Sequence, residues 1–212
     1  MPDLYLNDTR RIRVVGGLAV VEYYDIVSET WEAEKKPVTL SAEPWLLDVT
    51  AVVGLNPAPH TAVGGTNFPY AELDYDDAQE EYSCWRFALP PNFDPIQDII
   101  FRLFWKSGTA IVGDAVWGAS VLGRTEGDDI AAAAMGVNVQ VVDTVPGVVE
   151  QLAVAVITLT PAQHALAAND MVIVMLTRDG ADPADTLVGD AHLVMVKVDV
   201  AINPAVLIEG MP

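Results

Sequence analysis

The chain has 212 residues, 51% of them apolar, which is long and apolar enough to bury a core rather than remain disordered. It carries 11 Lys and Arg against 30 Asp and Glu, a net charge of −19. A surface this acidic repels the phosphate backbone of nucleic acids and the anionic surface of a membrane, so the sequence predicts neither as a partner.

The first 55 residues are predicted to form short strands, because Val, Leu, Ile and Tyr cluster between turn residues. These strands cover Leu4–Leu6, Ile12–Val15, Leu18–Tyr24 and Val38–Leu40. So few large apolar side chains form a marginal core, and we expect residues 1–55 to rest on a partner surface or on the rest of the chain. The Pro- and Gly-rich stretch 56–66 that follows is typical of a linker.

Residues 67–202 are predicted to form a second, larger unit of about eight strands separated by turn signals, before a C-terminal tail at 203–212. The predicted strands are Tyr70–Tyr75, Glu81–Leu89, Asp98–Lys106, Asp114–Leu122, Asp128–Val142, Gln151–Thr160, Met171–Arg178 and Leu187–Ala201. A short helix is expected at Pro161–Ala168 with Thr160 as its N-cap. Strands at this spacing without long helices indicate an all-β sandwich or barrel.

Alternating side chains indicate which faces are buried. Ile99, Phe101, Leu103 and Trp105 share one face of their strand, which predicts a core-facing row. Trp85, Phe87 and Leu89 form a similar row opposite Cys84 and Arg86.

Two strands, Leu152–Leu159 and Met171–Leu176, are apolar on both faces, so each needs cover on its outer side as well. A neighbouring subunit is the simplest cover, and the sequence therefore predicts a homo-oligomer. The alternative is cover by the N-terminal segment of the same chain.

The sequence predicts no catalytic residue, no cofactor and no metal site, and hence no enzyme. One cysteine, Cys84, excludes an intrachain disulfide, and we expect it to be a small buried side chain. The three histidines, His60, His164 and His192, have no metal-site spacing. The N-terminus lacks the pattern of a signal peptide, so synthesis in a cytoplasm is expected.

Two acidic clusters are the feature of the sequence that most resembles a ligand-binding site. The first contains Asp74, Asp76, Asp77, Glu80 and Glu81, and the second contains Asp179, Asp182 and Asp185. Either could supply some ligands of a calcium ion, but neither matches a known calcium loop, and solvated acidic loops are the favoured interpretation.

Exposed aromatic side chains could stack on sugars. Trp85, Trp105 and Trp117 lie in alternating strands and are predicted to be core. Trp31, Trp45 and the stretch Phe68-Pro69-Tyr70 are freer, and a carbohydrate platform stays open as an interpretation.

The order of strand and turn motifs over about residues 66–201 resembles the jelly-roll domains of tailed-virus particle proteins, among them capsid decoration (cement) proteins and head fibres. The resemblance rests on Phe68-Pro69-Tyr70, Trp85–Pro90, Phe101–Trp105, Val116-Trp117, Thr158–Thr160, Arg178-Asp179 and Asp185–Ala191. It implies an eight-stranded jelly-roll sandwich preceded by a small strand-rich attachment segment, and it carries over no functional residue.

The resemblance implies a virion structural protein of a bacteriophage. Residues 1–55 would bind the major capsid protein, and the acidic jelly roll would stand outward on the capsid surface as a homotrimer that stabilises the shell by non-covalent contacts. Two alternatives stay open: a tail-fibre or head-fibre module that binds a host receptor or glycan, and a major capsid protein with a single jelly roll. A metal-dependent or glycan-hydrolysing enzyme is the most distant interpretation.

Overall fold

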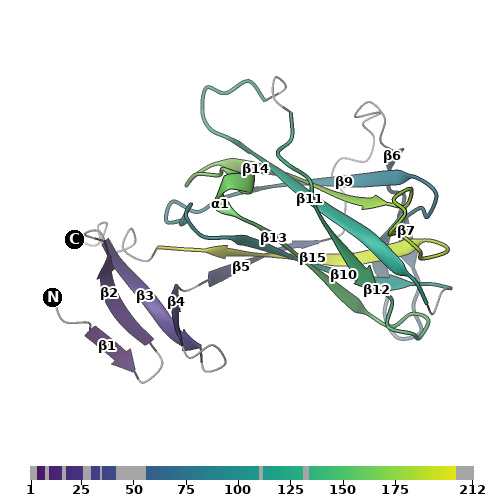
Figure 1. The fold of residues 1–212 in the computed structure, drawn as a ribbon, viewed down its shortest axis with the longest axis horizontal. Coiled ribbons are helices and arrows are strands. Elements are labelled where there is room, and N and C mark those ends of the chain that lie inside the picture. Colours follow the sequence, from purple (N-terminus) through teal and green to yellow (C-terminus); the bar gives the residue numbers. More distant parts are fainter. Residues whose placement is uncertain are drawn as a thin grey trace.

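The computed structural model in Figure 1 is built almost entirely from β-strands. It describes residues 56–109, 112–130 and 134–203 in full and, within residues 4–41, the backbone of five strands. The helix in the described part of the chain is too short to cross a membrane. Residues 204–212, most of the predicted tail, lie outside the described residues.

Eight strands form the central part of the predicted sandwich. They are β8 (Tyr70–Tyr75), β9 (Glu80–Ala88), β10 (Ile99–Ser107), β11 (Asp114–Arg124), β12 (Val139–Thr144), β13 (Ala153–Leu159), β14 (Met171–Asp179) and β15 (Ala191–Ala201). One sheet has the order β13-β10-β15-β8 and the other β12-β11-β14-β9, with every neighbouring pair antiparallel. Numbered one to eight along the chain, these orders are 6-3-8-1 and 5-4-7-2, the interlocked Greek keys of a jelly roll. The predicted fold class is confirmed.

The core lies between the two sheets and follows the alternation in the sequence. The row Ile99, Phe101, Leu103 and Trp105 on β10 is completely buried. It faces Trp117 of β11, whose ring centroid lies 5.8 Å from that of Trp105. Aromatic contacts of this kind join the two layers and add to the area they bury.

Three boundaries in the sandwich differ from the prediction by four residues or more, and the first two have a local reason. Asp128, predicted to begin a strand, instead closes a turn by accepting a hydrogen bond from the Thr125 amide, and β12 begins only at Val139. The helix α1 (Pro161–His164) begins with the expected Thr160 cap but ends early, because Ala165 has a left-handed φ of 47°. β15 begins at Ala191, later than the predicted Leu187.

The predicted linker at 56–66 is corrected by the structure, because two strands in it belong to the sandwich. β6 (Asn56–Pro57) pairs in parallel with β9, and β7 (His60–Val63) pairs antiparallel with β8. Both strands satisfy backbone groups that edge strands would otherwise leave open. Ala58 between them is completely buried.

The N-terminal region forms strands, as predicted. β1 (Leu4–Asn7), β2 (Arg10–Val15), β3 (Leu18–Asp25) and β4 (Thr30–Ala33) make a separate antiparallel sheet in chain order. β5 (Lys35–Ser41) pairs instead with β15, so it extends a sheet of the sandwich at its edge. The side chain of Trp31 and all of Trp45 lie outside the described residues.

The two strands with apolar outer faces differ in exposure. Leu152, just before β13, and Val154 and Val156 on it are 52%, 39% and 42% exposed. On β14, Ile173 and Met175 are half-buried. Within the described part of the chain, the outer face of β13 is therefore open to solvent.

One buried cation ties the two sheets together. Arg178 on β14 is completely buried, and its guanidinium donates two hydrogen bonds to Asp185, at 3.0 and 2.8 Å. It also donates to the carbonyl oxygens of Tyr75, Leu187 and Gly189 at 2.8 to 3.0 Å. All five donors of the guanidinium are thus used, which is the condition under which a buried charge is tolerated.

We expect Arg178→Met to lower the free energy of unfolding by about 3–5 kcal/mol, because it leaves Asp185 buried without a counter-charge. Arg102→Met is the matched control. Arg102 also binds one carboxylate, that of Asp199 at 3.1 Å, but it is 38% exposed. Its loss should cost about 1 kcal/mol or less. Urea denaturation of both variants measures the difference, and equal small losses would contradict the structural role of Arg178.

Candidate functional site

The outer face of the β13-β10-β15-β8 sheet carries a row of charged side chains. Lys106 on β10 is paired in register with His192 on β15, and His192 is paired with Asp74 on β8. The alternation that buries Leu73 and Leu193 turns these neighbours outward. Glu72 lies on the same face, two residues before Asp74.

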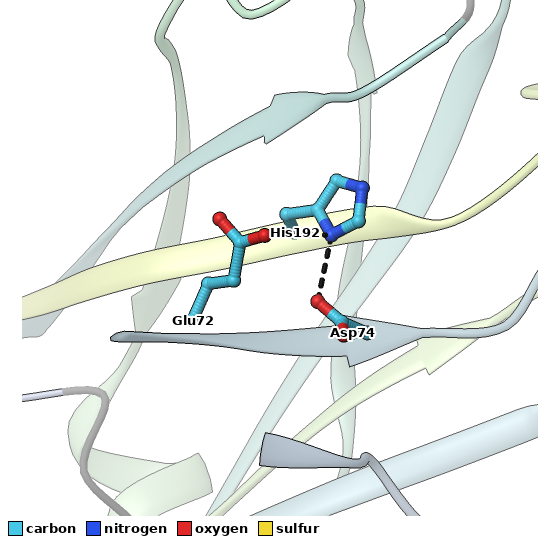
Figure 2. A group of neighbouring side chains, drawn as sticks. All are labelled: Glu72, Asp74 and His192. Atoms are coloured by element: carbon cyan, nitrogen blue, oxygen red, sulfur yellow. Dashed lines mark hydrogen bonds and ion pairs between the residues drawn. The ribbon is translucent and has the colours of Figure 1, made fainter. Parts of the chain in front are cut away.

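Glu72 and Asp74 converge on the imidazole of His192, as Figure 2 shows. His192 Nδ1 lies 2.7 Å from Asp74 Oδ1 and 3.4 Å from Glu72 Oε1. Glu72 is only 4% exposed, although it is ionisable. A carboxylate with so little access to water needs nearby positive charge.

The second oxygen of each carboxylate has its own partner. Asp74 Oδ2 accepts a hydrogen bond from the Thr61 hydroxyl on β7. Glu72 Oε2 lies 3.1 Å from the Lys106 ammonium, which also forms an ion pair with Glu150. Lys106 Nζ is 5.5 Å from the centre of the Tyr70 ring. Four strands and one loop therefore hold the group in place.

These contacts shift the pKa values of the group towards its charged forms. The hydrogen bond to Asp74 raises the pKa of His192, more than burial lowers it. Burial raises the pKa of Asp74, but the hydrogen bonds from His192 and Thr61 outweigh it and the pKa is lowered. Burial also lowers the pKa of Lys106, and its contacts with Glu150, Tyr70 and Glu72 more than reverse this effect.

A pocket of about 640 Å³ opens beside this group. Its lining combines aromatic, charged and small side chains: Val63, Gly65, Thr66, Asn67, Phe68, Tyr70, Glu72, Lys106, Glu150 and His192. Phe68 is 67% exposed, and its ring centroid lies 5.9 Å from that of Tyr70. The pocket thus has an aromatic wall next to a set of hydrogen-bonding groups.

The structure separates the aromatic side chains as predicted. Trp85, Trp105 and Trp117 are buried in the core, whereas Phe68 and Tyr70 reach the pocket.

The predicted acidic clusters are only partly solvated loops. Glu81 is 4% exposed and accepts a hydrogen bond from the Asp76 amide. Asp77 accepts one from the Gly189 amide, and Asp185 is paired with Arg178. Burial raises the pKa of Glu80, and the nearby carboxylate of Asp179 raises it further. Asp74 belongs to the group around His192.

The other two histidines and Cys84 lie outside the group around His192. His60 is exposed on β7. His164 is buried, and its two ring nitrogens contact the Gln97 carbonyl and the Leu166 amide. Cys84, expected in the core, is half-buried on the outer face of β9, and burial raises its pKa to about 11. Its thiol is therefore almost entirely protonated at neutral pH.

Comparisons with known proteins give distant likenesses only. No family model matches the chain, and neither does a curated protein. Among solved structures, a CBM35 module of Cellvibrio japonicus Abf62 is 13% identical, with a TM-score of 0.40 over 77% of this chain and 92% of that one.

Two further structures are similar at the same level. A family 11 carbohydrate-binding module from Clostridium thermocellum, in complex with a β-1,3-1,4-mixed-linked tetrasaccharide, is 11% identical, with a TM-score of 0.42 over 79% of this chain and 97% of that one. An exo-β-1,3-galactanase from Phanerochaete chrysosporium is 12% identical, with a TM-score of 0.41, and is covered over only 42% of its length by 92% of this chain. The jelly-roll assignment rests on the strand order above.

We expect the pKa of His192 to lie above 6.5 and to fall in an Asp74→Asn variant, because the charged hydrogen-bond partner is removed. Glu126→Gln, an exposed change in the β11–β12 loop, is the control and should leave that pKa unchanged. NMR titration of the imidazole resonances measures both.

The raised pKa of His192 also makes the stability of the fold depend on pH. A raised folded-state pKa means that the contribution of His192 is full below its unfolded value of 6.5 and is lost as pH rises through the folded-state pKa. If the pKa of His192 were unchanged in the Asp74→Asn variant, the hydrogen bond between His192 and Asp74 would be contradicted.

Proposed function

We propose that this chain is a non-catalytic binding module that recognises a carbohydrate in the pocket beside His192. The observation that carries the proposal is the combination of an exposed aromatic wall, Phe68 and Tyr70, with convergent charged groups in one open pocket. Its volume, about 640 Å³, is within the range of small-molecule sites.

The chemistry of the lining matches a sugar. Aromatic rings pack against the apolar C–H face of a sugar ring, while carboxylates and ammonium groups accept from and donate to its hydroxyl groups. Glu150 and Lys106 supply such groups in the lining of the pocket. Because the chain is strongly acidic, we expect neutral glycans to bind better than anionic ones.

The carboxylates favour binding over hydrolysis. A glycosidase needs an acid and a base placed on either side of the scissile bond. Glu72 and Asp74 instead lie on one strand and point at the same imidazole, with their nearest oxygens 3.4 and 2.7 Å from Nδ1.

A glycan array followed by calorimetry on the full chain tests this function. We expect a neutral oligosaccharide to bind, and Phe68→Ala and Tyr70→Ala each to weaken its affinity roughly tenfold or more. Phe104→Ala is the matched control, because Phe104 is a half-buried aromatic on the same sheet face but outside the pocket lining. Equal losses in all three variants, or no glycan bound at all, would refute the proposal.

A virion structural role is the second candidate, and the exposed row Leu152, Val154 and Val156 favours it. Exposed apolar side chains along a strand mark an interaction surface. In this proposal the row joins copies of the chain into a homotrimer on a capsid, and residues 1–55 bind the major capsid protein. Assembly of the isolated protein into closed shells would point instead to a major capsid protein.

Light scattering on the full chain measures its mass in solution. If the row is a subunit contact, Val154→Asp should dissociate the oligomer, because it places a charge in an apolar interface. Val188→Asp is the control, since Val188 is 75% exposed and lies outside the row. A monomeric wild-type chain, or an oligomer that survives Val154→Asp, would refute this contact.

A further inference from the structure

We propose that Glu72, Asp74 and His192 form a binding site for one divalent transition-metal ion of the zinc class. Each residue offers one ligand atom, and the three atoms all lie within 4.8 Å of one another. They come from two paired neighbouring strands, β8 and β15, and point to a common position in Figure 2. The inference does not depend on the carbohydrate proposal.

The carboxylates are oriented as the ligands of a metal site usually are. In each, one oxygen is engaged by a positioning partner: Asp74 Oδ2 by the Thr61 hydroxyl, and Glu72 Oε2 by Lys106 at 3.1 Å. The other oxygens, Oδ1 and Oε1, are the ones that face His192 Nδ1. Contacts behind the ligands hold them in place and tune the affinity for the ion.

The charge of the surroundings also favours a cation. The group contains three carboxylates, those of Glu72, Asp74 and Glu150, against one ammonium, that of Lys106, and the imidazole of His192. Glu72 is nearly completely buried, so its charge is poorly compensated by water. A bound ion would neutralise the excess, with His192 as a neutral ligand whose Nδ1 proton is released to solvent.

The donor set selects the kind of ion. Calcium takes six to eight oxygen ligands, whereas this site offers two carboxylates and one imidazole nitrogen. Three ligands of mixed oxygen and nitrogen type suit zinc and leave a fourth position open. Glu72 and His192 both line the pocket, so the site borders a space that a small molecule can enter.

Gly108 gives the imidazole the room it occupies. A Cβ atom at this position would lie 2.9 Å from His192 Nε2 and 3.5 Å from Glu150 Oε1. A larger residue would displace the ring from the position in which its Nδ1 faces the two carboxylates.

The test is calorimetry of Zn²⁺ binding to the full chain, without an affinity tag and after treatment with a chelator. We expect one ion per chain, a much weaker response to Ca²⁺, and an affinity that falls at least roughly tenfold in both His192→Gln and Asp74→Asn. His60→Gln is the matched control, because His60 is an exposed histidine outside the group. It should bind Zn²⁺ like the wild type.

Two results would overturn the proposal. Binding that survives in His192→Gln would place the ion elsewhere, and absence of binding at millimolar Zn²⁺ would make the group an ion-pair network only.

A measurement on the wild-type chain covers the case in which a variant fails to fold. Zn²⁺ should shift the NMR resonances of the His192 ring and leave those of His60 and His164 unchanged, and a shift confined to His60 would refute the site. Neither experiment contains a sugar. Failure of the metal site is therefore distinguishable from failure of carbohydrate binding.

Discussion

The bidentate pair of Arg178 and Asp185 is the contact on which the rest of the sandwich depends. Arg178 belongs to β14 in one sheet, but its guanidinium also binds the carbonyl of Tyr75 at the end of β8 in the other. Asp185 in turn accepts a hydrogen bond from the Val116 amide on β11. One ion pair thus joins both layers at the same end of the sandwich. Apolar packing alone would define the position of one sheet relative to the other less strictly.

The same contact helps to set the geometry of the candidate site. Arg178 binds the carbonyls of Leu187 and Gly189, which lead directly into β15, and that of Tyr75, which follows Asp74. The strands that carry His192 and Asp74 are therefore anchored to one guanidinium. A buried ion pair with every donor satisfied tolerates few alternative arrangements, because another arrangement would leave a buried charge without its partner.

The strands were predictable from the sequence, but the site was not. Alternation in Ile99–Trp105 marks a half-buried strand without knowledge of its neighbours. Asp74, Lys106 and His192 are far apart in the chain, and only the jelly-roll order places β8, β15 and β10 side by side. The sequence did contain one signal for this site. Charged residues occupy outward-facing positions on strands that the jelly-roll order makes neighbours. The burial of Asp185 could not be read from an acidic loop, because the loop residues alone do not show that Arg178 of the preceding strand, β14, binds it.

Half of the residues that line the pocket lie on paired strands, and this links occupancy to the stability of the whole domain. Side chains on central strands lose their positions only when the sheet itself opens, an event close to global unfolding. A molecule bound there is therefore held by the folded state alone and shifts the unfolding equilibrium in proportion to the logarithm of its concentration. The melting temperature of the chain becomes a direct reporter of ligands, so a library of sugars and metal ions can be screened without any assay of function.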